Sequence, residues 1–333
     1  MSRFCLLVLL GCLVIPAVGR SAENTWVGQR VMPKMNCELR EKGRVIKDSK
    51  LNRVPYIVVQ TQDDWLLVGD RVPGWVKTTD IVLLADAVKY YGDVIKKTPT
   101  DTLALVRRAI AQQALGQVDP AIADYSAVIK AEPKNSLALN NRGSVYSRKK
   151  DHVNALADFN AALQLDPKYT QAYINRGSLL ADQEKWDLAL ADFDKALELD
   201  PHDSRAHYNR GSVFEAKGNQ EKAVIEYKEA IRSNTRDPLA YNNLAWILAT
   251  SANNQIRDGK IAVEVATKAC ELTSWKDSEN LDTLAAGYAE SGNWAKAVET
   301  QEIAVRLSTT AEAKADLQTR VDLYKQQKPF RIK

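Results

Sequence analysis

A repeat of 34 residues is the feature of this sequence that most restricts its fold. Asn recurs at this spacing, each time with Gly or Ala two positions later, at Asn141, Asn175, Asn209 and Asn243. Regular repeats of roughly 20 to 50 residues form solenoids, in which each unit buries its apolar face against its neighbours. The sequence therefore predicts a solenoid of helical hairpins, an architecture that usually binds partners and carries no chemistry of its own.

Small and aromatic residues repeat at fixed positions of each unit, counted from Ser136, Thr170 and Ser204 as position 1. Positions 8, 20 and 27 are small: Gly143, Ala155 and Ala162, then Gly177, Ala189 and Ala196, then Gly211, Ala223 and Ala230. Position 24 is aromatic, and a proline follows the second helix: Phe159, Phe193 and Tyr227, with Pro133, Pro167 and Pro201. Small residues let antiparallel helices approach closely, the aromatic ring fills the space between units, and proline ends a helix. The small and aromatic positions are the predicted core.

Together these positions resemble the tetratricopeptide repeat. An earlier unit fits through Ala109 and Tyr125, and two later units fit as well, the first of them with five extra residues around 251–258. The resemblance implies a mainly α-helical superhelix of about six units over residues 102–310. A linker helix is expected over residues 85–101, and a capping helix with a tail is expected over residues 311–333.

Residues 23–84 follow a period of two rather than 3.6, which predicts a small all-β domain. The segments 56–61, 65–68, 75–77 and 81–84 are the predicted strands. Their sequence resembles the second half of an SH3-like barrel. Members that bind proline-rich ligands normally carry an aromatic residue near the place of Ile81, and this chain does not. Bacterial members often recognise cell-wall peptides, so the resemblance leaves peptidoglycan open as a ligand.

The first 22 residues have the pattern of a secretory signal peptide. Arg3 is followed by a nearly continuous apolar run over residues 4–15, and then by the small residues Ala17, Gly19, Ser21 and Ala22. The run is too short to span a membrane stably. The pattern predicts export to the periplasm or cell envelope, with cleavage after Gly19 or Ala22. An uncleaved N-terminal anchor and lipidation at Cys12 are the alternatives, and no other segment is expected to cross a membrane.

Charged residues also repeat, at positions 7 and 23. Position 7 is Arg and position 23 is acidic in the first four units: Arg108 and Asp124, Arg142 and Asp158, Arg176 and Asp192, Arg210 and Glu226. In the fifth unit both positions become apolar, Leu244 and Val265, so the two charges disappear together. Because the helices of a unit are antiparallel, the two positions can face each other. The sequence favours an ion pair within each unit over a basic row that binds a ligand.

The resemblance implies that positions 2, 5, 6 and 9 of each first helix line a concave groove. The residues there that indicate partner binding are Asn141, Asn175, Asn209, Asn243, Ser144, Ser178, Ser212, Arg205 and Tyr208. An Asn amide both donates and accepts, so a row of them can bond to the backbone of an extended peptide. In the alternative interpretation, Asn caps local backbone or keeps the groove soluble. Since positions facing a groove bury little, replacing two of these Asn residues by Ala is expected to leave the fold nearly intact.

No arrangement of catalytic or metal-binding residues is evident in the sequence. Of the three histidines, His152, His202 and His207, neither His152 nor His202 has a constellation of Cys or carboxylate residues at ligand spacing, and no known catalytic motif occurs. Cys37 and Cys270 are predicted to be free thiols. A formal net charge of +4 without a basic block does not predict nucleic-acid binding. The sequence thus predicts no enzyme, no cofactor and no metal.

The predicted function is that of a non-enzymatic exported scaffold or adaptor, which binds an extended segment of a partner protein in its groove. Two alternatives remain open. One is a cell-wall-associated protein that binds peptidoglycan through the SH3-like domain, and the other is an accessory subunit of an envelope enzyme.

Overall fold

The computed structural model describes residues 27–35, 39–41, 44–46, 55–62, 64–68 and 74–332. The predicted signal peptide, residues 1–22, and Cys37 lie outside the described residues. The chain divides into two compact parts, an N-terminal part, Met1–Pro133, and a C-terminal part, Lys134–Lys333. Within the described residues, no helix is both long and apolar enough to cross a membrane.

The N-terminal part begins with an antiparallel sheet whose strands lie in the order β3-β2-β6-β5-β4-β1-β7. The strands are β1 (Arg30–Pro33), β2 (Leu39–Glu41), β3 (Arg44–Ile46), β4 (Tyr56–Gln62), β5 (Trp65–Val68), β6 (Gly74–Lys77) and β7 (Ile81–Leu83). The four predicted strands are confirmed, except that Leu84 already begins a helix. A small core is formed by Val31, Tyr56, Val58, Leu66, Val68, Val76 and Ile81. The likeness to an SH3-like barrel stays a prediction.

Three helices complete the described residues of the N-terminal part: α1 (Leu84–Lys97), α2 (Thr102–Ala114) and α3 (Val118–Ala131). The fully buried Tyr91 of α1 donates its hydroxyl to the carbonyl of Pro33. Arg107 of α2 donates to the carbonyl of Lys34 over 2.8 Å. Because both bonds reach the end of β1, they tie α1 and α2 to the sheet. The sheet and these two helices belong to the same compact part of the chain.

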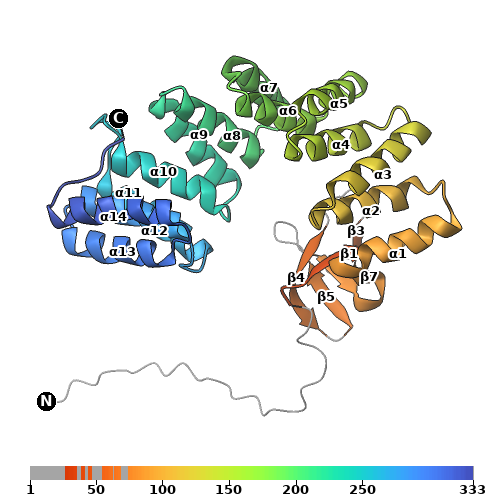
Figure 1. Ribbon diagram of the computed structural model, residues 1–333, viewed down its shortest axis with the longest axis horizontal. Coiled ribbons are helices and arrows are strands. Elements are labelled where there is room, and N and C mark those ends of the chain that lie inside the picture. Colours follow the sequence, from red (N-terminus) through yellow and green to blue (C-terminus); the bar gives the residue numbers. More distant parts are fainter. Residues whose placement is uncertain are drawn as a thin grey trace, which may run out of the picture. The chain divides into compact units, whose positions relative to one another are not determined.

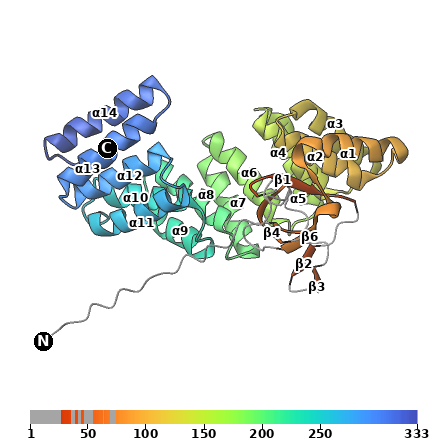
Figure 2. The same cartoon turned by 90° about the horizontal axis from the view of Figure 1, so that it is seen from below.

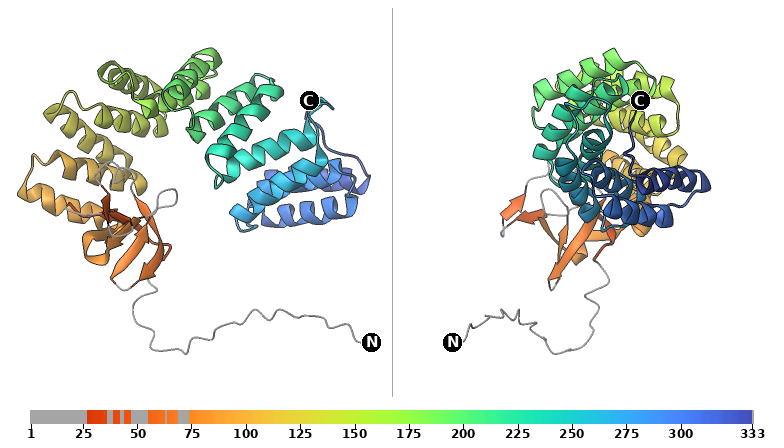
Figure 3. Two further views of the ribbon diagram at one scale, coloured as in Figure 1. Left: turned by 180° about the vertical axis from the view of Figure 1, so that it is seen from behind. Right: turned by 90° about the vertical axis from the view of Figure 1, so that its left-hand side faces the viewer.

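The C-terminal part is built from helices that pair as hairpins, with one further helix after the last pair (Figure 1, Figure 2 and Figure 3). They are α4 (Ser136–Arg148), α5 (His152–Leu165), α6 (Thr170–Asp182), α7 (Trp186–Leu199), α8 (Ser204–Ala216), α9 (Gln220–Ser233), α10 (Pro238–Thr250), α11 (Gly259–Leu272), α12 (Ser278–Glu290), α13 (Trp294–Leu307) and α14 (Ala311–Lys325). Asn135 and Asp203 accept from the first turns of α4 and α8, which fixes where these helices begin. The predicted mainly α-helical solenoid is confirmed.

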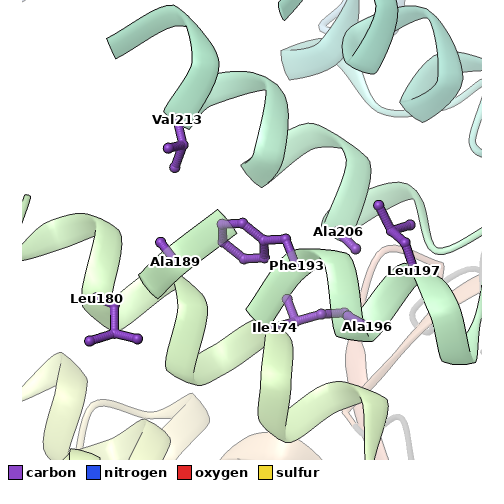
Figure 4. Packing of buried hydrophobic residues seen from close by; sticks show 8 residues of the cluster. All are labelled: Ile174, Leu180, Ala189, Phe193, Ala196, Leu197, Ala206 and Val213. Atoms are coloured by element: carbon purple, nitrogen blue, oxygen red, sulfur yellow. The ribbon is translucent and has the colours of Figure 1, made fainter. Parts of the chain in front are cut away.

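Each of the central units packs around the aromatic side chain at position 24. Phe193 is fully buried at the centre of a cluster drawn from α6, α7 and α8 (Figure 4). A Cβ on Gly177 would lie only 2.8 Å from Cε1 of Phe193, so glycine is the residue that fits beside this ring without repacking. The same contact recurs between Gly143 and Phe159 and between Gly211 and Tyr227. The predicted core positions are therefore confirmed.

The repeated charges form ion pairs within each unit. Arg176 donates from Nε and Nη2 to the two carboxylate oxygens of Asp192, over 2.8 and 2.6 Å. The side chain of Asp192 is 7% exposed and that of Arg176 is 24% exposed. The matching pairs are Arg108–Asp124, Arg142–Asp158 and Arg210–Glu226. Arg176 also donates from Nη1 to Asn160 of the preceding unit over 2.7 Å, so its guanidinium joins neighbouring units. The prediction of ion pairs rather than a basic ligand-binding row is confirmed.

Candidate functional site

The predicted serines at position 9 are anchored to their own helices. Ser144, Ser178 and Ser212 each donate to the carbonyl four residues earlier, over 3.0, 2.8 and 3.1 Å. All three side chains are partly exposed. Because the hydroxyl proton is used within the helix, the lone pairs of each Oγ are left to accept a bond from elsewhere.

At Ser144 and Ser178, the asparagine at position 6 of the next unit supplies that bond. Asn175 donates from Nδ2 to Ser144 Oγ over 3.1 Å and to Asn140 Oδ1 over 2.9 Å. Asn209 donates to Ser178 Oγ over 2.9 Å. We call Asn175, Asn209 and Asn243 with Ser144, Ser178 and Ser212 the Asn–Ser row. Asn175 and Asn209 thus also bond one unit to the next, a role that the expectation of a nearly intact fold did not include. Each lost amide bond costs about 1 kcal/mol.

The row ends in a cluster around Tyr227. Asn243 donates from Nδ2 to the hydroxyls of Tyr208 and Tyr227, over 3.3 and 3.2 Å. The hydroxyl of Tyr227 donates to Glu215 over 2.7 Å and lies 3.2 Å from Ser212 Oγ. Burial raises the pKa of the Glu215 carboxyl, and the bond from Tyr227 lowers it in part. Tyr208 is thus bonded to the end of the row and is partly exposed.

A cavity of about 440 Å³ opens between α6, α7 and α8. Three predicted residues, Ser178, Asn209 and Ser212, form its polar side. Trp186 and Val213 give it apolar surface, and we call it the Trp186 cavity. Asn209 uses its amide N–H on Ser178, while its Oδ1 accepts no bond from any described residue. The cavity therefore combines an unused hydrogen-bond acceptor with an apolar wall.

The rim of the Trp186 cavity is acidic. Asp182 and Glu184 are the charged residues that line it, and both are exposed. Nearby Asp187 already pairs with Lys217 over 2.7 Å, so this pair adds little net charge. Two carboxylates beside an apolar wall attract a ligand that carries positive charge next to an apolar group.

The other predicted site residues do not line this cavity. Arg205 is exposed and pairs with Asp203, which caps the start of the same helix, over 3.3 Å. Asn141 accepts from Asn140 over 3.2 Å. Asn175, Asn243 and Tyr208 belong to the Asn–Ser row or its end but lie outside the cavity lining. Trp186 was not among the residues predicted from the sequence, although a Trp at the first residue of a second helix was an available signal.

His207 of α8 and Glu226 of α9 form a buried ionisable pair outside the lining of the Trp186 cavity. His207 is 8% exposed, and its Nδ1 lies 2.8 Å from Glu226 while its Nε2 lies 3.1 Å from the carbonyl of Pro201. Both neighbours accept, so the ring satisfies both only as the imidazolium. Burial opposes this charge, but the bonds to Glu226 and Pro201 outweigh it and raise the pKa of His207 above 6.5, against a smaller opposing effect of Arg210. Among the described residues, no group of three or more potential metal ligands occurs.

Because its pKa is raised in the folded state, His207 stabilises the fold fully below its unfolded pKa of about 6.5, and this contribution is lost as pH rises through the folded pKa. The lowered pKa of Glu226 affects stability only in acid, because its contribution is lost as pH falls through the folded pKa. We expect the free energy of unfolding of the wild type to fall as pH rises above about 6.5, and that of His207→Gln to fall less. Urea titrations at several pH values measure both. A wild-type curve that rises over this range relative to the variant would contradict the assignment.

Comparison with known proteins identifies the repeats. A sequence profile of the tetratricopeptide repeat matches residues 106–170 and 174–238. Comparison with curated proteins finds no match. A chain of the APC/C hetero-tetramer Cut9–Hcn1 superposes with a TM-score of 0.60 at 14% identity, over 72% of this chain and 46% of that one.

Two smaller solved structures are also similar. A tetratricopeptide repeat protein from Parabacteroides merdae gives a TM-score of 0.48 at 19% identity, over 72% of this chain and 92% of that one. MamA gives a TM-score of 0.41 at 22% identity, over 46% and 90%. The profile match and the fold together show that this chain carries tetratricopeptide repeats and has the fold of a tetratricopeptide solenoid.

Proposed function

We propose that this chain is a non-enzymatic scaffold that holds an extended segment of a partner protein along the Asn–Ser row, with the Trp186 cavity as the main contact. One observation carries the proposal: Ser178, Asn209 and Ser212, which come from two units, meet at one cavity with an apolar wall. Recognition sites typically combine apolar surface with a few placed polar groups.

The cavity supports a particular partner chemistry. Trp186 and Val213 suit a bulky apolar side chain, and the Oδ1 of Asn209 suits a backbone N–H of the bound segment. Asp182 and Glu184 suit a Lys or Arg beside it. The partner segment is therefore extended, with an apolar residue close to a basic one.

The signal-peptide pattern of residues 1–22 supports export of this scaffold. On this proposal the partner is a protein of the periplasm or cell envelope, and attachment through an uncleaved or lipidated N-terminus is the alternative to a free exported chain. Fractionation of the producing cells, with Cys12→Ser as the comparison, tests the two forms.

Selection of peptides from a random library on the full chain tests the binding site. We expect the selected peptides to carry an apolar residue next to Lys or Arg. We expect Trp186→Ala to weaken their binding by about 10- to 100-fold, because a large ring in a cavity is a typical hot spot. Asp182→Lys should weaken binding by about 10-fold, and more at low salt, because a rim charge acts through space.

Leu188 provides the matched control. It lies on α7 as Trp186 does, is 58% exposed and does not line the cavity. Leu188→Ala should leave peptide affinity unchanged. Peptides that bind the wild type, Trp186→Ala and Asp182→Lys equally well would show that the cavity is not the binding site. Circular dichroism of each variant separates lost binding from lost structure.

A further inference from the structure

The chain turns back on itself after α14. Gln327 adopts a left-handed backbone conformation, with φ of 54°, and the chain then runs to the end of α10 (Figure 1). The backbone N–H of Ile332 donates to the carbonyl of Thr250 over 3.0 Å. We call residues 326–332 the tail.

The tail supplies hydrogen bonds that α10 lacks. Thr250 is the last residue of α10, and the carbonyls of a last turn have no partner inside their helix. Arg331 donates from Nη1 to the carbonyl of Ala249 over 3.4 Å, beside the bond from Ile332. A cation is also favoured at the negative C-terminal end of a helix.

Side chains of the tail meet two further groups. The ring of Phe330 lies 5.6 Å from the ring of Trp246, centroid to centroid. Arg331 forms an ion pair with Glu290 at the end of α12. Three consecutive tail residues, Phe330, Arg331 and Ile332, thus each contact a different feature, as an extended peptide does when it binds to a surface.

Other residues hold these features in place. Arg257 donates to Glu290 over 2.9 Å, so this carboxylate keeps a partner when the tail leaves. Arg320 is fixed by Asp282 over 2.7 Å, and its guanidinium lies 5.9 Å from the ring of Trp246. Glu290 and Arg320 therefore each have a partner outside the tail.

The tail is partly exposed, but its Phe330 also packs against an apolar cluster at the end of the array that includes Tyr324 of α14. Residues 330–332 are all partly exposed. The core residues of α14, namely Leu317, Val321 and Tyr324, are 6%, 0% and 0% exposed. Helix α14 thus closes the array together with Phe330 of the tail. Trp246 stands at position 9 of its unit, the position at which Ser178 lines the Trp186 cavity.

We propose that Trp246, Glu290 and the end of α10 form a docking site for an extended segment of the sequence aromatic–Arg–aliphatic, which the tail occupies in this chain. A partner protein that presents such a segment competes with the tail. The tether raises the local tail concentration to the order of millimolar, so the site opens only to a partner that outcompetes it. The site shares no residue with the Trp186 cavity, so each proposal stands or fails alone.

A labelled peptide with the sequence of residues 327–333 tests the site on a chain that ends at Gln326. We expect saturable binding to this shortened chain, and binding at least about 10-fold weaker to the full chain, where the tethered tail competes. Peptides with Phe330→Ala or Arg331→Ala should each bind at least about 10-fold more weakly than the parent peptide. A peptide with Lys328→Ala is the matched control and should bind as the parent does, because Lys328 is exposed.

No saturable binding to a shortened chain with native helix content would overturn the proposal, and so would binding that ignores the Phe330 and Arg331 changes. If the shortened chain loses helix, the full chain with Phe330→Ala and Arg331→Ala takes its place, since it frees the site without shortening the chain. Binding of the parent peptide to that variant supports the docking site, and its absence overturns it.

Discussion

Arg176→Leu is expected to destabilise the third repeat unit by about 3 to 5 kcal/mol, because it leaves the buried carboxylate of Asp192 without its cation. Asp192 is 7% exposed and receives both of its short bonds from Arg176. Adding Asp192→Leu should recover part of the loss. The fifth unit already uses this apolar solution, with Leu244 in a core cluster and Val265 packed against it.

A double-mutant cycle of urea unfolding, followed by circular dichroism, measures the coupling between Arg176 and Asp192. We expect a coupling of about 2 to 3 kcal/mol. The exposed pair Lys195–Glu198 on α7 is the control, and an exposed pair of this kind contributes less than about 1 kcal/mol. Losses that simply add at positions 176 and 192 would contradict the ion-pair account.

Phe193→Ala is expected to cost about 3 to 5 kcal/mol, since it empties a fully buried site between α6, α7 and α8. In a repeat protein each unit contacts only its neighbours, so the loss falls on this junction. Urea unfolding of the full chain measures the loss. Leu188→Ala on the same helix is the control and should change stability by less than about 0.5 kcal/mol, because Leu188 is 58% exposed. Equal effects of the two changes would show that position 24 does not hold the units together.

The fold was predictable because small residues recur at positions 8 and 20 of each unit and an aromatic residue recurs at position 24 of the first four. A single Gly177 or Phe193 says little, but their repetition at positions 8 and 24 indicates a contact. The structure shows that contact, since a Cβ added to Gly177 would come within 2.8 Å of the Phe193 ring. The ion pairs were predictable for a related reason, because Arg at position 7 and an acid at position 23 disappear together in the fifth unit.

The candidate site was only partly predictable. Positions 6 and 9 follow from the pattern within one unit, but the bond from Asn209 to Ser178 crosses from one unit to the next and was missed. Its separation of 31 residues recurs between Asn175 and Ser144 and was the available signal. Trp186 and the tail have no such period, because a cavity and a returning segment depend on how the units pack and leave no repeating trace in the sequence.

Photo-crosslinking from the Trp186 cavity tests the central claim most directly. A photoreactive residue replaces Asp182, which lines the cavity and is exposed, and in a second chain it replaces Leu188, which is exposed on α7 outside the cavity. Both chains are produced in the native cells and irradiated there, and the linked peptides are sequenced. The proposed function predicts one partner protein linked from position 182 and not from 188, through an extended segment with an apolar and a basic residue. Equal linkage from both positions, or none from 182 in cells that contain the folded chain, would contradict it.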